Sequence, residues 1–127
     1  MRLQLRTLAL TLACAVVPQG AVAQAADGSA IILPLEAQTC RLPNAPARIP
    51  EDADLKTLAE GKGRITEFQQ ALVDYRECLD QSRKEGITLG NRIALDRAHD
   101  YSVDLETRVA EQFNVAVRAY KARQQTD

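Results

Sequence analysis

The chain has 127 residues, 16 basic and 17 acidic side chains, a formal charge of −1 and no tryptophan. This length suffices for one small domain. Because no basic stripe is present to replace counterions on phosphates, the composition argues against nucleic-acid binding. With few large aromatic residues, the core must come from Leu, Ile, Val and Ala, which is typical of helical packing.

Residues 1–23 have the pattern of an export signal. Arg2 and Arg6 give a basic start, an apolar run covers residues 8–17, and Ala21-Val22-Ala23 offers a small-x-small cleavage motif. The apolar run is shorter than the roughly 20 residues that span a bilayer, and no later segment approaches that length. We therefore expect a periplasmic or secreted protein with no transmembrane segment in its mature form.

Cleavage after Ala23 would leave a mature chain that begins at Gln24. This chain has 14 basic and 17 acidic residues, a charge of about −3, because Arg2 and Arg6 leave with the signal. In an alternative interpretation Cys14 becomes the lipidated terminus of a membrane-anchored lipoprotein, because Leu12-Ala13-Cys14 faintly resembles a lipobox.

Residues 24–50 form a Pro-rich segment that we expect to be extended. Its prolines fix φ and remove amide donors, which favours a polyproline-like path over a regular helix; they are Pro34, Pro43, Pro46 and Pro50. The apolar patch Ala30–Leu35 has three interpretations: a mobile spacer, a short edge strand, or a plug that lies on the helices.

A first helix is predicted just after Pro50, with Asp54 as its N-cap. Its apolar positions keep one face, at steps of three, four or seven residues: Leu55, Leu58, Ile65, Phe68, Leu72, Tyr75 and Leu79. Gly61 and Gly63 each cost the helix about 1 kcal/mol relative to alanine, so its first section should be its weakest. Gly86, which follows Arg83 and Lys84, is interpreted as the C-terminal stop.

A second helix is predicted from Thr88 or Asn91 to about Arg123. Its main apolar stripe contains Ala94, Ala98, Tyr101, Leu105, Val109, Phe113, Ala116 and Tyr120, and a second set widens this face to roughly half the circumference. One partner helix cannot cover so wide a face. The candidate interaction face consists of Leu95, Val103, Ala110, Phe113 and Val117, to be covered by the Pro-rich segment, a second copy or another protein.

The short connection around Gly86 makes the two helices antiparallel neighbours. The predicted fold is all-α: a helical hairpin of residues 51–123, with the Pro-rich segment tied to it and a short tail at 124–127. Cys40 and Cys78 are the two cysteines beyond the signal, and 14 extended residues from Cys40 to Asp54 can reach back along the helix to Cys78. In an exported protein this pairing is favoured over an intermolecular bond or free thiols.

Several short motifs resemble those of small exported helical-hairpin proteins of Gram-negative bacteria, a group without an assigned activity. They are Cys40-Arg-Leu-Pro43, Pro46, Ile49-Pro50, Tyr75-Arg-Glu-Cys78-Leu79, Phe113-Asn114 and Arg118-Ala-Tyr120-Lys121. The resemblance covers most of residues 40–123 and supports the hairpin and the bridge. Asp52 departs from the pattern, in which glycine is common after the proline.

His99 is the chain's only histidine, and Asp96, Asp100 and Asp104 are its acidic helical neighbours. A carboxylate and an imidazole three residues apart on a helix can share a metal ion or exchange protons. Such charges more often form a solvated, salt-bridged face, here with Arg92 and Arg108. We therefore assign no catalytic, cofactor-binding or metal-binding residue.

Three function classes remain. The leading hypothesis is a non-enzymatic cell-envelope protein that binds a protein partner through a helix face. The second is a self-assembling structural protein, in which two hairpins form a four-helix bundle as a homodimer. The third is a small metal-binding or ligand-binding protein centred on His99.

Overall fold

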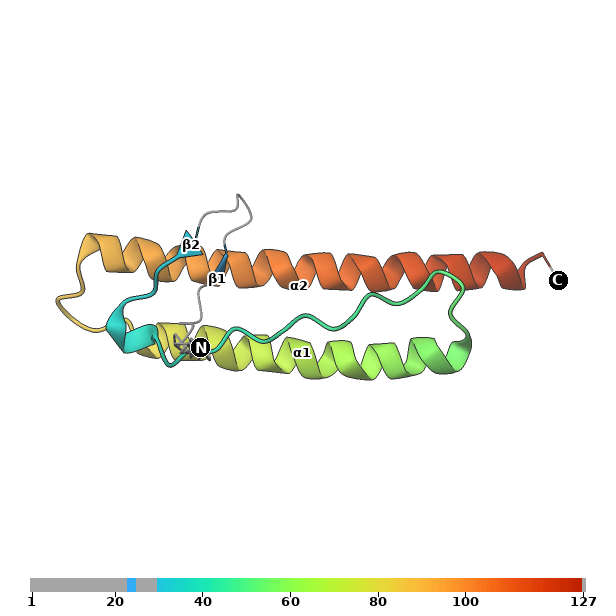
Figure 1. Ribbon diagram of the computed structural model, residues 1–127, viewed down its shortest axis with the longest axis horizontal. Coiled ribbons are helices and arrows are strands. Elements are labelled where there is room, and N and C mark those ends of the chain that lie inside the picture. The colour runs from blue at the N-terminus through green and yellow to red at the C-terminus, as the bar shows by residue number, and fades with distance from the viewer. Residues whose placement is uncertain (1–22, 25–29, 127) are drawn as a thin grey trace, which may run out of the picture.

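The computed structural model describes residues 23–24 and 30–126, and the predicted export signal and the lipidation alternative at Cys14 lie outside this part, apart from Ala23. Two long helices dominate the described residues, α1 (Leu55–Gln81) and α2 (Leu89–Gln124). They lie side by side and antiparallel, and α2 is the longer, with 36 residues against 27 (Figure 1). The predicted all-α hairpin is confirmed.

Three very short elements precede the hairpin. Strand β1 (Ala23–Gln24) pairs antiparallel with strand β2 (Ala30–Ile31), so that Ala23 lies opposite Ile31. A single 3₁₀ turn follows as η1 (Leu35–Ala37). The Pro-rich part of the chain is therefore not continuously extended.

Both helices begin after a capping side chain: Asp54, the predicted cap of α1, and Thr88, one of the two predicted start positions of α2. The Asp54 carboxylate accepts a hydrogen bond from the Thr57 backbone N–H at 2.7 Å, and this bond lowers the pKa of Asp54. The Thr88 hydroxyl accepts from the Asn91 backbone N–H at 3.2 Å. Each cap satisfies an amide that has no partner within the first helical turn.

The end of α1 differs from the prediction. The helix ends at Gln81, and the Ser82 backbone N–H bonds to the Cys78 and Leu79 carbonyls, each at 3.2 Å. Gly86 was wrongly assigned as the helix stop: it lies in the connecting loop, where its φ of +79° requires the left-handed conformation that glycine adopts without strain. The basic residues before it also follow the helix rather than occupy its last turn.

The lead segment, residues 31–53, runs beside both helices from the hairpin loop to the start of α1 (Figure 1). Every third residue of it up to position 49 is buried or half-buried: Ile31, Pro34, Ala37, Cys40, Pro43, Pro46 and Ile49. Polyproline II and 3₁₀ helices both have three residues per turn, so this spacing puts one side of the segment against the helices.

The apolar patch at the start of the lead segment is divided. Ile31 is buried and Leu33 packs against the same cluster, whereas Ile32 and Leu35 are 78% and 77% exposed. The patch therefore includes the end of a short strand, and part of it lies on the helices, as two of the three interpretations predicted.

Three apolar clusters hold the lead segment and the helices together. At the loop end Ile31, Ala37 and Cys40 are buried with four helix residues, namely Tyr75, Leu79, Leu95 and Ala98. In the middle Leu42 packs against Phe68, Leu72 and Val109. At the open end, where α1 begins, Ile49 and Ala53 are buried with Leu58 and Ala116. Every phenylalanine and tyrosine of the chain belongs to, or packs against, one of these clusters.

Gly61 has a structural role that its low helix propensity does not indicate. A Cβ at this position would overlap Cδ1 of Ile49 and lie 3.0 Å from its Cγ1, whereas a Cβ at Gly63 meets nothing within 4 Å. The absent side chain at position 61 thus makes room for the lead segment. Helix α1 continues through this section without interruption.

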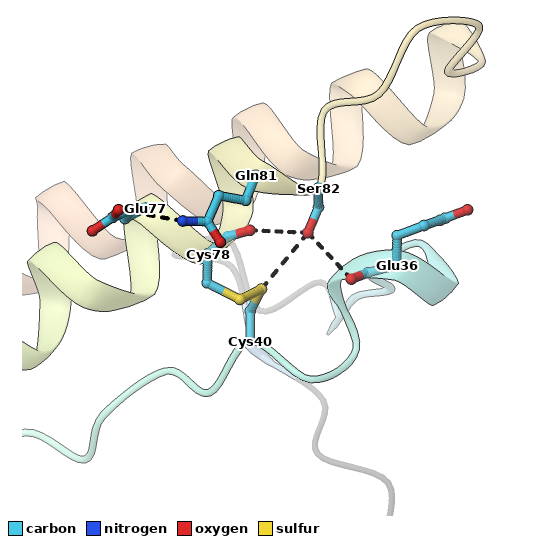
Figure 2. Close-up of a disulfide and its surroundings, with 6 residues drawn as sticks. All are labelled: Glu36, Cys40, Glu77, Cys78, Gln81 and Ser82. Atoms are coloured by element: carbon cyan, nitrogen blue, oxygen red, sulfur yellow. Dashed lines mark hydrogen bonds between the residues drawn. A yellow bond between two sulfur atoms is a disulfide. The ribbon is translucent and has the colours of Figure 1, made fainter.

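The predicted disulfide is present between Cys40 and Cys78, with Cα atoms 5.6 Å apart (Figure 2). The two residues are 38 positions apart. In the chain-entropy account, closing such a loop stabilises the folded state by about 4 kcal/mol.

Candidate functional site

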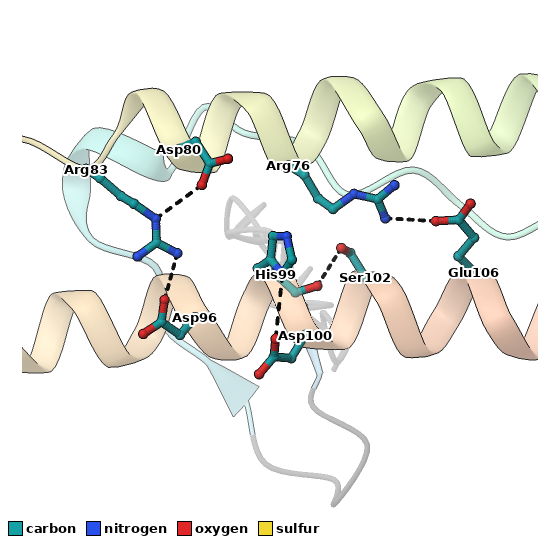
Figure 3. A network of polar contacts seen from close by, with 8 residues as sticks. All are labelled: Arg76, Asp80, Arg83, Asp96, His99, Asp100, Ser102 and Glu106. Atoms are coloured by element: carbon teal, nitrogen blue, oxygen red, sulfur yellow. Dashed lines mark hydrogen bonds and ion pairs between the residues drawn. The ribbon is translucent and has the colours of Figure 1, made fainter.

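Ion pairs and hydrogen bonds connect the two helices along one side of the hairpin (Figure 3). Arg76 Nη1 donates to Glu106 Oε2 at 2.9 Å, and Gln69 Nε2 donates to Glu106 Oε1 at 3.3 Å. Nearer the loop, Arg83 Nη2 lies 2.7 Å from Asp96 Oδ1, and this hydrogen bond raises the pKa of Arg83. These contacts pair the charges of Arg76, Glu106, Arg83 and Asp96 without a ligand.

The residues around His99 do not converge. His99 Nδ1 lies 3.6 Å from Asp100 Oδ1, and Asp96 is engaged by Arg83 across the hairpin. Asp104 is exposed. Within residues 23–24 and 30–126, no three His, Cys, Asp or Glu side chains come together as a metal-binding group.

Two buried hydroxyl groups bond to the backbone. The Ser102 hydroxyl, at 0% exposure, donates to the His99 carbonyl at 2.6 Å. The Ser82 hydroxyl bonds to the Cys78 and Glu36 carbonyls at 2.9 and 3.2 Å (Figure 2). Both hydroxyls thus have backbone partners, and in the described residues neither has a hydrogen bond to the His99 imidazole, the bond that would activate it as a nucleophile.

The hairpin loop borders a shallow depression of about 290 Å³. Its lining includes Glu36, Glu85 and Lys84, together with neutral residues of the loop and the first turn of α2. Charges of both signs therefore line it, and it favours no particular class of ligand.

The candidate interaction face on α2 is divided by the structure. Leu95 is 0% exposed within the hairpin's own core, so it is not accessible to a partner. Phe113 and Val117 are partly buried against the cluster around Ile49, so the chain's own lead segment accounts for part of this face. Val103 is 42% exposed and Ala110 is half-buried.

Two exposed residues that the candidate face did not include lie near Val103 around α2. Leu89 is 70% exposed and Ile93 is 44% exposed. At 100° per residue, both fall within about 80° of Val103, on the side of the helix opposite the buried Ala98. We call Leu89, Ile93 and Val103 the outward side of α2. In the sequence, these residues could have been recognised as apolar residues of the second helix that lie outside its main stripe.

The outward side of α1 offers a useful comparison. Val73 is 47% exposed, nearly the same as Val103, and it lies between the polar neighbours Asp74 and Gln70. It is an isolated exposed valine in this stretch, and single exposed apolar residues are ordinary on protein surfaces.

Comparisons with protein-family models, curated proteins and solved structures gave no match. In the described part of the chain, neither helix combines the length and hydrophobicity needed to cross a membrane.

Proposed function

We propose that this chain is an exported, non-enzymatic protein of the cell envelope that binds an amphipathic helix of a partner protein. The outward side of α2 is the proposed contact. The observation that carries the proposal is the exposure of Leu89, Ile93 and Val103 on one side of a helix whose other side is already buried.

The buried side of α2 has its full complement of contacts within the chain. Leu95 and Ala98 are covered at the loop end, Val109 in the middle and Ala116 at the open end. The outward residues are consequently not needed for the hairpin's own core. Leu89 and Ile93, one helical turn apart, are an exposed apolar pair that a helix with a matching stripe can contact, and Asp96 and Asp100 separate this pair from Val103.

The contact would be modest in area and partly polar. Asp96 and Asp100 lie between Ile93 and Val103 on the same side, and both are exposed. Asp96 is already paired with Arg83, so a Lys or Arg of a partner helix would pair with Asp100, and such a pair selects a partner more than it adds affinity.

The predicted export signal at residues 1–23 supports a periplasmic or secreted location. The Cys40–Cys78 disulfide fits an oxidising compartment, where such bonds form and persist. N-terminal sequencing of the protein purified from its native cells tests this. A chain that begins at Gln24 supports cleavage after Ala23, whereas a chain that begins at a lipidated Cys14 supports the lipoprotein alternative.

Site-specific photo-crosslinking in cells that express the full chain tests the contact. A photoreactive residue replaces Val103 in one sample and Val73 in a matched control, and adducts are identified by mass spectrometry. We expect an adduct to one other protein from position 103 that is absent from position 73. Ile93→Glu, made in the position-103 sample, should abolish that adduct.

Two results would contradict the proposal. Adducts confined to copies of this chain would favour the four-helix bundle of two hairpins. Equal adducts from both positions, or an adduct insensitive to Ile93→Glu, would show that the outward side of α2 confers no specificity.

A further inference from the structure

The lead segment is fastened to the hairpin at its two ends by different means. At the loop end the fastening is covalent, through Cys40 and Cys78. At the open end it is noncovalent, through Ile49 and through Arg123, whose Nη1 and Nη2 donate to the Glu51 and Ala53 carbonyls.

The open-end fastening does not depend on the disulfide. Ile49 and Ala53 are each 6% exposed, and Ile49 fills the space left by Gly61. Both residues lie within six positions of Leu55, where α1 starts, so little chain must be ordered to keep them in place.

Besides the disulfide, the loop-end fastening consists of apolar burial and of contacts to the Ser82 hydroxyl, which lies 3.8 Å from Cys40 Sγ. The Ser82 hydroxyl has one hydrogen, which the Glu36 and Cys78 carbonyls share. Cys40 lies 15 positions from Leu55, and three of the intervening residues are prolines without an amide donor. Ile31 and Ala37 bury apolar surface there, but they are farther still from the point at which the chain joins α1.

We propose that the Cys40–Cys78 bond is a redox-controlled latch. Its reduction by a dithiol releases residues 31–42 from the hairpin, while residues 49–53 and both helices keep their places. This inference goes beyond the proposed function and does not depend on it.

Cys78 is the more exposed of the two bonded residues. Cys40 is 7% exposed, whereas Cys78 is partly exposed at the surface of α1. One thiolate of the dithiol attacks the Cys78 sulfur, forms a mixed disulfide with it and displaces Cys40 as a thiolate, which then takes a proton. The second thiolate of the dithiol breaks the mixed disulfide and releases Cys78. The dithiol is thereby oxidised to its own disulfide, and the protein is reduced by two electrons.

Release would uncover a specific apolar surface. Tyr75, Leu79, Leu95 and Ala98 are between 0% and 3% exposed in the oxidised chain, and Ile31, Ala37 and Cys40 share their cluster. The surface lies at the loop end of the hairpin, where both helices contribute to it. The oxidised and reduced chains would therefore present different faces.

Hydrogen exchange with mass spectrometry of the full-length purified chain tests the latch, with and without dithiothreitol. We expect exchange in residues 31–42 to become at least about tenfold faster on reduction, including the Ala37 and Cys40 amides, which are bonded in the oxidised chain. Exchange in residues 51–60 should be unchanged, and far-UV circular dichroism should report the same helix content. The Cys40→Ser, Cys78→Ser double variant should reproduce the reduced pattern without reductant.

Ile49→Ala is the matched control at the other end. In the oxidised chain it should speed exchange around residues 51–54 and leave residues 31–42 protected. Unchanged exchange of residues 31–42 on reduction would overturn the proposal, because noncovalent contacts would then suffice. Loss of helix content, or equal release at both ends, would also overturn it, because the bond would then maintain the whole fold.

Discussion

The loop end and the open end of the hairpin bury the same lead segment against the same two helices, yet they do so differently. The loop end relies on apolar burial and on a covalent bond to α1 from Cys40, which lies 15 positions before the start of that helix. The open end relies on Ile49 beside Gly61, on the Arg123 hydrogen bonds and on its closeness to the start of α1. The difference indicates that a crosslink is needed where chain entropy opposes docking most strongly.

Removal of the disulfide should have the largest effect on stability. We expect the Cys40→Ser, Cys78→Ser double variant to lower the free energy of unfolding by about 4 kcal/mol, because the unfolded chain regains the entropy of an open loop. Urea denaturation measures this change. The native chain in reductant should unfold at the same urea concentration as the variant. Equal free energies of unfolding with and without the bond would show that the loop end, like the open end, is held by noncovalent contacts.

The glycine pair in α1 tests the open end. Gly63→Ala should stabilise the protein by about 1 kcal/mol through helix propensity. Gly61→Ala should destabilise it by about 1 kcal/mol, because crowding against buried Ile49 outweighs the same propensity gain. Thermal or urea unfolding of both variants gives the comparison.

Ile49→Ala provides the control for the glycine pair. In that background Gly61→Ala should become stabilising, since the side chain that it crowds is gone. If Gly61→Ala were stabilising in the native background, Ile49 would be able to move aside without a large loss of packing.

Alkaline pH should have the smallest effect and should act at the loop end. Tyr75 is 3% exposed, and burial raises its pKa above the ordinary 10.0. As the pH rises above about 10, the unfolded chain loses this proton before the folded chain does, so stability should fall. Tyr75→Phe should reduce that fall in brief unfolding measurements between about pH 9 and 11; an unaltered pH dependence would show that the loop-end cluster readily admits the ionised phenol.

The sequence predicted those features whose signals are local or depend on few residues. Asp54 and Thr88 cap the helices because their short side chains reach amides three positions ahead, irrespective of the rest of the fold. The Cys40–Cys78 pairing followed from the compartment and from the reach of the chain. Gly86 was misplaced because its left-handed conformation suits a loop as well as a helix end, and α1 ends earlier, at Gln81.

The candidate interaction face illustrates the limit of helical periodicity. The pattern of α2 identified an apolar face too wide for one partner helix, but it placed Leu95, Val103 and Phe113 together in the candidate interaction face. In the structure these are respectively buried in the hairpin, exposed, and partly buried in the cluster around Ile49. Periodicity gives the angle of a residue around its own helix, and the path of the lead segment decides what covers that angle.

By itself, then, the sequence determined the two helices, their antiparallel arrangement and the pairing of two cysteines, because hydrophobic periodicity, capping residues and chain reach are properties of the chain taken in order. The tertiary structure alone decided that Gly61 makes room for Ile49, that Arg123 bonds to the chain just before α1, and that Leu89, Ile93 and Val103 remain exposed. Each of these depends on contacts between residues at least ten positions apart, or on their absence, and such contacts are set by packing in three dimensions.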